Sequence, residues 1–212
     1  MSLRWLALGD SYTIGEGVPP EGRWSHQLAA RLRAGGIDIA DPRTIAVTGW
    51  TTDELAAGID AAEPLPRDWD FVSLLIGVNN QYRGRSVADY HAEFDGLLRR
   101  AIAFAGGNPA RVLVLSIPDW GVTRFGRDSG RDPVQVAAEL DAFNAAALEV
   151  CQARGVAFVD ITTASRVDAD AGPMLADDGL HPSATMYATW VDAAEPAARL
   201  LLEPGAAAHP LA

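Results

Sequence analysis

The feature that most limits the fold is a regular alternation of short apolar runs with longer amphipathic stretches. Five runs are apolar throughout or nearly so, which is typical of strands buried on both faces of a parallel sheet; they cover residues 5–8, 44–47, 71–76, 112–115 and 156–159. Between them, apolar side chains recur every three or four residues at 87–101 and 137–151, as on one face of an α-helix. The alternation predicts a doubly wound, mostly parallel α/β domain.

Local signals indicate where several elements begin or break. Thr51 and Glu54 have the spacing of a capping box, which predicts a helix start before the third strand. A last helical pattern runs over 187–201, where Pro196 is expected to kink or split the helix. Residues 119–132 form the longest irregular stretch, and we expect either a plain surface loop or a loop that faces the substrate.

Length and charge exclude several classes of protein. The 212 residues contain no repeat and no linker, so we expect one domain over residues 1–203 and a flexible tail over 204–212. The net charge of −11 disfavours nucleic acid or an anionic membrane as a partner. No run approaches the roughly 18 apolar residues of a membrane span, and no leader peptide opens the chain, which predicts a soluble, cytoplasmic protein.

The residue types present remove further kinds of chemistry. All 17 Lys and Arg residues are arginines, so Schiff-base chemistry and a phosphate-loop lysine are excluded. Cys151 is the single cysteine, and its place on an apolar helical stripe predicts a core residue. The four histidines lie far apart and lack a metal-binding spacing, so no metal site is expected.

The first predicted strand runs into Gly9-Asp10-Ser11, which places a serine at the carboxyl end of a strand. Taken alone, Ser11 is better explained as the cap of a turn or of the next helix. It does not belong to the G-x-S-x-G elbow of α/β-hydrolases, because Thr13 stands where the second glycine is required.

Three further elements offer groups for catalysis. Asp178 precedes His181 by three residues in a turn rich in Gly and Pro, so the carboxylate can reach the ring and fix its tautomer. The alternative is a capped helix start near Pro182, with the histidine in solvent. Gly49 follows the second strand and Asn79 the third, where they offer a backbone N–H and an amide N–H. Taken singly, both are ordinary turn residues.

The positions of these four elements favour a common site. Each follows a predicted strand or precedes the last helix, and in a doubly wound sheet such positions meet at one edge. Acyl transfer needs the groups that these elements offer: a nucleophile, a base with its orienting acid, and two oxyanion donors.

The same blocks resemble the SGNH hydrolases, also called the GDSL esterase/lipase family. The blocks are Gly9-Asp10-Ser11, Gly49, Gly77-Val78-Asn79-Asn80 and Asp178-Gly179-Leu180-His181. The resemblance covers nearly the whole chain and implies a flavodoxin-like three-layer α/β/α sandwich around a mostly parallel, five-stranded sheet. In such a sheet the first strand is central and lies between the second and the third.

The resemblance also implies a role for each residue. Ser11 is the nucleophile, His181 is the base, and Asp178 orients the histidine in preference to the neighbouring Asp177. Three groups form the oxyanion hole: the backbone N–H of Ser11, the backbone N–H of Gly49 and the side chain of Asn79. Asn80 departs from the family pattern, which often has an aspartate there.

The expected function is that of a serine esterase of the lipase or acylhydrolase type, acting on carboxylic esters through an acyl-enzyme on Ser11. Its partner is a small-molecule ester, and no cofactor is implied; the sequence indicates no oligomeric state. One alternative is a carbohydrate acetylesterase of the same family. Another is a non-catalytic flavodoxin-like binding module with a phosphate or flavin at the first turn. The side chains expected at the substrate are Trp50, Asn80, Tyr82 and Trp120.

Overall fold

The computed structural model of the chain describes residues 1–167 and 174–203, so the expected tail at 204–212 lies outside the described residues. Within these ranges the sheet consists of β1 (Trp5–Gly9), β2 (Arg43–Ala46), β3 (Phe71–Leu75), β4 (Val112–Leu115) and β5 (Ala157–Val159). All neighbouring strands are parallel, and their order is β2-β1-β3-β4-β5. The first strand therefore lies between the second and the third, and this prediction is confirmed.

Helices connect the strands, as the alternation of patterns predicts. They are α1 (Ser11–Ile14), α2 (Trp24–Ala34), α3 (Thr52–Ala62), α4 (Val78–Tyr82), α5 (Val87–Phe104), α6 (Arg124–Asp128), α7 (Pro133–Arg154), α8 (Thr162–Arg166) and α9 (Ala184–Leu202), with 3₁₀ turns at Pro20–Gly22, Pro109–Arg111 and Trp120–Val122. Among the helices of the described ranges, none combines the length and the apolar character needed to cross a membrane.

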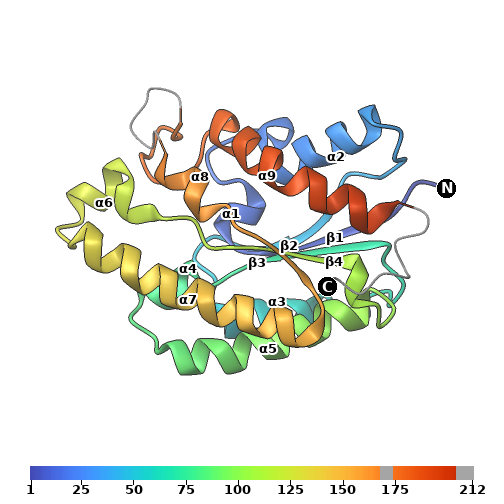
Figure 1. Ribbon diagram of the computed structural model, residues 1–212, viewed down its shortest axis with the longest axis horizontal. Coiled ribbons are helices and arrows are strands. Elements are labelled where there is room, and N and C mark those ends of the chain that lie inside the picture. The colour runs from blue at the N-terminus through green and yellow to red at the C-terminus, as the bar shows by residue number, and fades with distance from the viewer. Residues whose placement is uncertain (168–173, 204–212) are drawn as a thin grey trace.

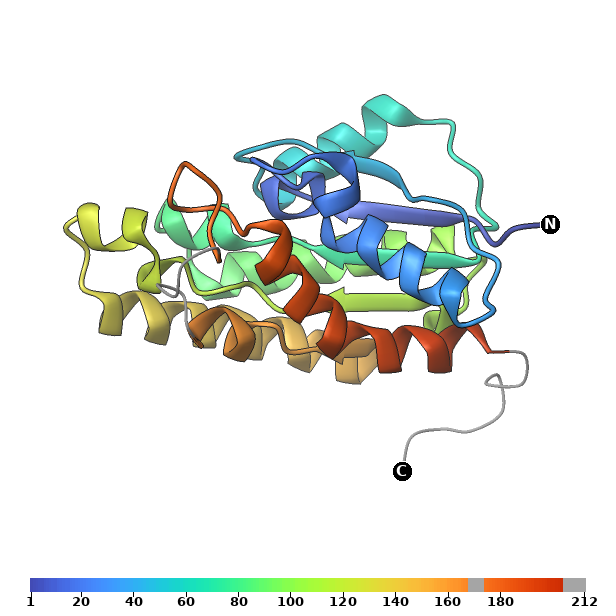
Figure 2. The same ribbon diagram turned by 90° about the horizontal axis from the view of Figure 1, so that it is seen from above.

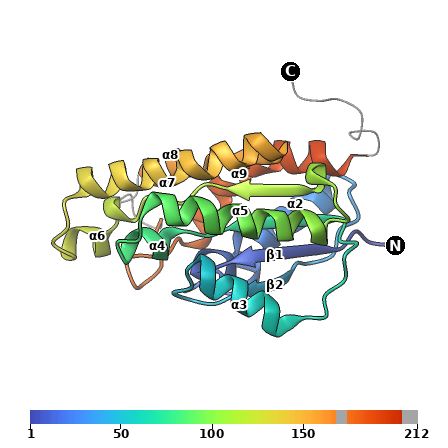
Figure 3. The same ribbon diagram turned by 90° about the horizontal axis from the view of Figure 1, so that it is seen from below.

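The helices cover both faces of the sheet and complete a three-layer α/β/α sandwich (Figure 1). On one face α2 packs against α9, with α1 and α8 beside them. On the other face lie α3, α5 and α7, seen from below in Figure 3. Parallel strands need crossover connections, and the helices between β1 and β5 supply them, whereas α8 and α9 follow the last strand. The fold class predicted from the sequence is confirmed.

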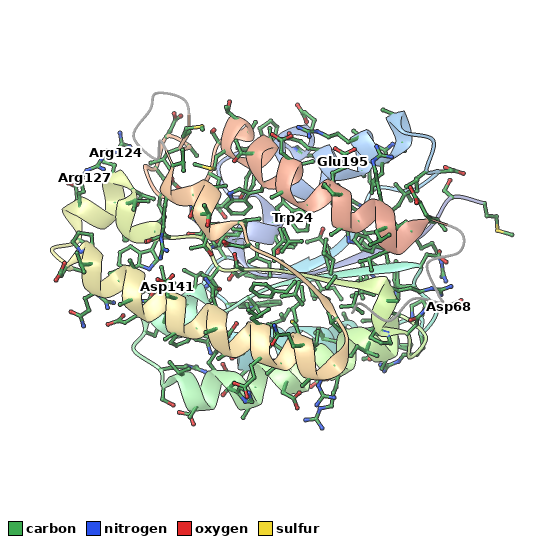
Figure 4. All side chains as sticks on the ribbon, viewed as in Figure 1. Trp24, Asp68, Arg124, Arg127, Asp141 and Glu195 are labelled. Atoms are coloured by element: carbon green, nitrogen blue, oxygen red, sulfur yellow. The ribbon has the colours of Figure 1, made fainter. Side chains whose placement is uncertain are left out.

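The core lies on both sides of the three central strands. Every residue of β1, β3 and β4 is buried, which explains why these strands are continuous apolar runs rather than alternating ones. Toward α2, Trp5 lies 5.7 Å from Trp24 and 5.0 Å from Phe71 between ring centroids; Figure 4 shows Trp24 between the sheet and the layer of α2 and α9. On the opposite face, Tyr90 lies 4.8 Å from Phe143.

Two local predictions are confirmed. The capping box opens α3: the side chain of Thr51 caps the helix, and its backbone N–H donates to Glu54 Oε2 at 2.9 Å. Cys151 lies fully buried on the inner face of α7. Burial raises the pKa of its thiol to about 12, so the side chain behaves as a small apolar residue.

The last helix is not split at the proline. α9 runs without interruption from Ala184 to Leu202 and includes Pro196. The proline is exposed, while Ala194 and Ala198 on either side of it are fully buried. Because the missing N–H and the ring lie away from the sheet, the buried face of the helix continues past them.

The stretch 119–132 is more regular than expected. It contains the 3₁₀ turn Trp120–Val122 and the helix α6. Each has an N-cap residue whose side chain binds its first turn. The side chain of Asp119 accepts the N–H of Gly121 at 2.8 Å, and Thr123 Oγ1 accepts the N–H of Gly126 at 3.0 Å. Asp and Thr are strong N-cap residues, and they are the signal that the prediction of a loop overlooked.

The packing of the central strands makes a stability prediction. Leu74 of β3 is fully buried, whereas Leu200 of α9 is 56 % exposed. Leu74→Ala is expected to lower the free energy of unfolding by about 2–5 kcal/mol, because it leaves a cavity. The matched change Leu200→Ala is expected to stay within about 0.5 kcal/mol. Urea denaturation of both variants measures the difference, and equal effects would contradict this assignment of the core.

Candidate active site

The predicted site residues converge at the edge of the sheet where the strands end. β1 leads into Ser11, β2 into the turn at 47–50, and β3 into α4, which carries Asn79. Parallel strands place these ends together. The segment before α9 reaches the same edge: the hydroxyl of Tyr187, at the start of α9, donates to the carbonyl of Tyr12 in α1 at 3.2 Å, and Figure 2 shows the two helices side by side.

Ser11 is the first residue of α1 and is 4 % exposed. Only Asp10 separates it from the end of β1, where Gly9 lets the chain pass close to β3. A Cβ atom at Gly9 would lie 2.4 Å from the carbonyl oxygen of Leu75 and 2.1 Å from Thr13 Oγ1. Real Cβ atoms do not approach other atoms so closely, so the glycine of the Gly9-Asp10-Ser11 block is required by packing.

Asp10 caps α1 from a fully buried position. Its Oδ1 accepts the N–H of Tyr12 at 3.0 Å, and its Oδ2 has no hydrogen-bond partner among the described residues. Burial raises the pKa of Asp10 from its usual 3.8 to about 7, and hydrogen bonds from backbone N–H groups offset this only in part. The residue before the candidate nucleophile is therefore a carboxyl group that holds its proton up to near-neutral pH.

Asp178 and His181 form a pair within one turn. His181 Nδ1 lies 2.6 Å from Asp178 Oδ2, and Asp178 Oδ1 accepts the backbone N–H groups of Leu180 and His181 at 2.9 and 3.0 Å. Burial tends to raise the pKa of Asp178, but the hydrogen bonds from His181 and from the two backbone groups outweigh it, so its pKa lies below the usual range. A charged carboxylate next to Nδ1 leaves Nε2 as the basic nitrogen of the ring.

Asp177 does not share this contact. Its backbone carbonyl accepts a hydrogen bond from Arg124 Nη2 at 2.7 Å, and the residue is exposed. Figure 4 places Arg124 and Arg127 at the end of the molecule that carries α6, opposite Asp68.

Tyr12 connects the serine to the histidine. Its ring lies 5.7 Å from the ring of His181 between centroids, in an edge-on arrangement, and 5.9 Å from that of Trp190 on α9. Because Tyr12 directly follows Ser11, this contact brings the start of α1 against the Asp178–His181 turn. His181 is 7 % exposed, so most of the imidazole lies out of bulk water.

The two candidate oxyanion donors lie on neighbouring segments. Gly49 has φ +86°, a left-handed conformation that glycine adopts readily. Asn79 lies in the first turn of α4, and its Nδ2 donates to the carbonyl of Trp50 at 2.9 Å. One N–H of the amide is thereby fixed on the carbonyl of the residue after Gly49.

Asn80, predicted from the sequence as a substrate contact, has hydrogen-bond partners within the protein. It is fully buried, its Oδ1 accepts the N–H of Thr52 at 3.1 Å, and its Nδ2 donates to Thr52 Oγ1 at 2.6 Å. The Thr52 hydroxyl donates in turn to Glu93. An amide at position 80 supplies both an acceptor and a donor beside the Glu93 carboxylate, which an ionised aspartate would not do.

The aromatic side chains named from the sequence differ in access. Tyr82 is 47 % exposed, whereas Trp120 is 2 % exposed and lies behind it, with 5.3 Å between ring centroids. Trp120 Nε1 donates to Gln81 Oε1 at 2.8 Å. Trp50 is half-buried and covers Gly58 of α3, where its ring atoms lie 2.1–2.9 Å from the position that a Cβ would take.

Phe125 completes this aromatic group and was not predicted from the sequence. Its ring lies 6.3 Å from Tyr82 and 6.0 Å from Trp120 between centroids. The signal was present, since Phe125 is an aromatic residue in the stretch 119–132, but only the folding of α6 toward α4 brings it to Tyr82. In the described part of the chain, no three His, Cys, Asp or Glu side chains are grouped so that they could hold a metal ion.

The model of the GDSL-like lipase/acylhydrolase family matches residues 7–189, so the chain belongs to this family. The match extends from β1 into α9 and includes the candidate residues Ser11, Gly49, Asn79, Asp178 and His181. No curated protein sequence matches the chain significantly.

Solved structures with the same fold are related to the chain at low identity. TesA is 21 % identical with a TM-score of 0.72, covering 94 % of this chain and 99 % of that one. A lipase/acylhydrolase from Enterococcus faecalis is 19 % identical with a TM-score of 0.71, covering 95 % and 98 %. A variant of Axe2, an acetyl xylan esterase from Geobacillus stearothermophilus, is 19 % identical with a TM-score of 0.68, covering 92 % and 94 %. These similarities establish the fold.

The buried carboxyl of Asp10 predicts how stability depends on pH. Between pH 3.8 and about 7 the folded protein keeps a proton that the unfolded chain has lost, so this group makes the fold less stable as pH rises. Asp10→Asn removes the titration and still offers an acceptor to the N–H of Tyr12. Relative to wild type, its free energy of unfolding is expected to rise from pH 4 to pH 7 by up to about 4 kcal/mol, at about 1.4 kcal/mol per pKa unit. Urea denaturation at several pH values measures this.

Asp53→Asn is the matched control. Relative to wild type, its free energy of unfolding is expected to fall rather than rise as pH increases, and to do so over a lower pH range. Hydrogen bonds from Arg85 and Thr51 lower the pKa of Asp53 to about 2. Its carboxylate therefore stabilises the fold above the pKa of the unfolded chain, and this stabilisation is lost as pH falls toward 2. Parallel pH profiles for the two variants would contradict the assignment of a proton to buried Asp10.

Proposed function

We propose that the protein is a serine esterase that hydrolyses carboxylic esters through an acyl-enzyme on Ser11. The observation that carries the proposal is the Asp178–His181 pair, with 2.6 Å between Asp178 Oδ2 and Nδ1 of the ring, next to the start of α1. Membership of the GDSL-like lipase/acylhydrolase family supports the same reaction class.

The proposed reaction begins with attack of Ser11 Oγ on the ester carbonyl. His181 accepts the hydroxyl proton at Nε2 and returns it to the leaving alcohol, which leaves the acyl group on the serine. Water activated by the same nitrogen then hydrolyses the acyl-enzyme. Asp178 stabilises the imidazolium that forms in each half-reaction, and its lowered pKa keeps it ionised for this role.

The oxyanion that forms in each step needs preorganised donors. The backbone N–H groups of Ser11 and Gly49 and the free N–H of Asn79 supply them in this proposal. The bond from Asn79 to the Trp50 carbonyl supports this role, because it holds the amide in one orientation before substrate arrives. A donor that is fixed in advance needs no reorganisation as charge develops.

The exposed edge of the aromatic group is the proposed contact for substrate. Tyr82 follows Asn79 on α4 and presents a half-exposed ring, with Trp120 and Phe125 behind and beside it. Trp50 flanks the turn that carries Gly49. Aromatic rings of this kind bind the apolar part of an ester or stack on a sugar ring. The carbohydrate acetylesterase therefore remains the second candidate within the same reaction.

A test of the nucleophile uses a fluorophosphonate probe and a substrate panel. The probe is expected to label Ser11 and no other serine, because only an activated hydroxyl attacks phosphorus readily. Ser11→Ala is expected to abolish both labelling and turnover of chromogenic esters, thioesters and acetylated sugars. Preference for acetylated sugars would select the second candidate. Labelling of Ser11→Ala, or absence of labelling in wild type, would refute the mechanism.

Variants at the two asparagines test the oxyanion hole. Asn79→Ala is expected to lower kcat by about 10²–10³-fold with KM nearly unchanged, because the amide acts on charge that develops in the transition state. Asn79→Asp is expected to be at least as harmful, since a carboxylate offers no donor. Asn80→Ala is expected mainly to destabilise the fold, by about 1–3 kcal/mol, because Thr52 loses its buried partner. Steady-state kinetics and denaturation curves separate the effects, and a severe loss of kcat at 80 with a mild one at 79 would reverse the assignment.

A further inference from the structure

The turn that carries the Gly49 donor receives little support from the sheet. It follows β2, which lies at one edge of the sheet and pairs with β1. Thr48 is exposed and Gly49 half-buried, and the N–H of Trp50 closes the turn on the carbonyl of Val47 at 3.2 Å. An oxyanion donor has to keep its position while charge develops, so this turn needs contacts from other elements.

Arg83 provides such a contact. Its Nη2 donates to the carbonyl oxygen of Gly49 at 2.7 Å, while its Nη1 lies 3.2 Å from Glu54 Oε1. Glu54 is itself fixed, because its Oε2 accepts the N–H of Thr51 at 2.9 Å in the capping box of α3. The planar guanidinium thus bridges the turn and the start of α3, with one nitrogen on each.

The same arginine belongs to the element that carries the second donor. Arg83 is the C-cap residue of α4, and its backbone N–H donates to the carbonyl of Asn79 at 3.0 Å. The Asn79 side chain in turn binds the carbonyl of Trp50. Two successive carbonyls of the turn, those of Gly49 and Trp50, are therefore held by α4. This arrangement fixes the distance between the Gly49 N–H and the Asn79 amide.

The exposure of the Arg83–Glu54 ion pair indicates that Arg83 holds the Gly49 turn in place without contributing much to the stability of the whole fold. The side chains of Arg83 and Glu54 are 44 % and 40 % exposed, and ion pairs in such surroundings stabilise a fold only slightly. Loss of the guanidinium would therefore leave the protein folded but release the Gly49 carbonyl. A small displacement of a donor is enough to slow a reaction strongly.

We propose that Arg83 is a positioning residue for the oxyanion hole, which holds the Gly49 turn in register with Asn79. The proposal rests on the proposed function, because it takes the Gly49 N–H as an oxyanion donor. Arg83 itself touches neither the nucleophile nor the base in the described structure.

The test compares Arg83→Ala with Arg85→Ala on one activated ester. Arg85 lies two residues away and pairs with Asp53 at 2.6 Å, so this control removes the same charge and leaves the Gly49 contact intact. Arg83→Ala is expected to lower kcat by about 10- to 100-fold with KM within about twofold of wild type. Arg85→Ala is expected to keep kcat within about twofold, and both variants should unfold at similar temperatures.

Two further readouts distinguish positioning from a structural role. Guanidinium chloride at a low, non-denaturing concentration should restore part of the activity of Arg83→Ala, relative to sodium chloride at the same ionic strength, and should not affect Arg85→Ala. The rate of fluorophosphonate labelling at Ser11 should fall in Arg83→Ala by a factor similar to that in kcat, because the adduct places an oxygen in the same hole.

The outcomes separate this proposal from the proposed function. If Ser11 is labelled equally fast in wild type and Arg83→Ala, with equal kcat, the role of Arg83 is refuted and the serine mechanism stands. If wild type is not labelled at all, the serine mechanism is refuted, and with it the role of Arg83 that rests on it. Should Arg83→Ala not fold, Glu54→Gln provides the test: it keeps the capping acceptor, weakens the hold on the guanidinium and is expected to lower kcat about two- to fivefold. An unchanged kcat in that variant would overturn the proposal.

Discussion

The parallel pairing of β1 with both β2 and β3 is the constraint on which the rest of the structure depends. It brings three strand ends to one edge, and with them the serine, the Gly49 turn and the helix that carries Asn79. The pairing in turn depends on Gly9, where a Cβ would meet the backbone of β3. The same glycine that lets the sheet close thus places Ser11 at the start of a helix directly above the sheet edge.

The candidate site is held together by side chains that bind backbone carbonyls and N–H groups of other elements. Asn80 holds the start of α3 through Thr52, and Asn79 and Arg83 hold two carbonyls of the turn after β2. The candidate base is built differently, since Asp178 and His181 lie in one turn and need no distant partner for their own contact. Tyr12 is the link between these two halves, through its ring contact with His181.

Burial divides the acidic groups of the site into two kinds. Asp10 lies in a fully buried cap with one unpartnered oxygen, so its pKa rises to about 7. Asp178 accepts three hydrogen bonds and its pKa falls below the usual range. Over the acidic range Asp10 therefore keeps its proton because burial removes it from solvent, whereas Asp178 is ionised because it accepts hydrogen bonds.

The sequence by itself determined the elements that depend on neighbours along the chain. Apolar runs predicted the five strands, Thr51 and Glu54 predicted the start of α3, and the spacing of Asp178 and His181 predicted a pair that can form within one turn. Only the tertiary structure decided contacts between distant segments, such as Arg83 on Gly49, Asn80 on Thr52 and Phe125 beside Tyr82. It also decided that Pro196 leaves α9 intact, because the proline faces solvent. Local hydrogen bonds and periodicity are encoded within a few residues, whereas the partner of a long side chain depends on how whole elements pack.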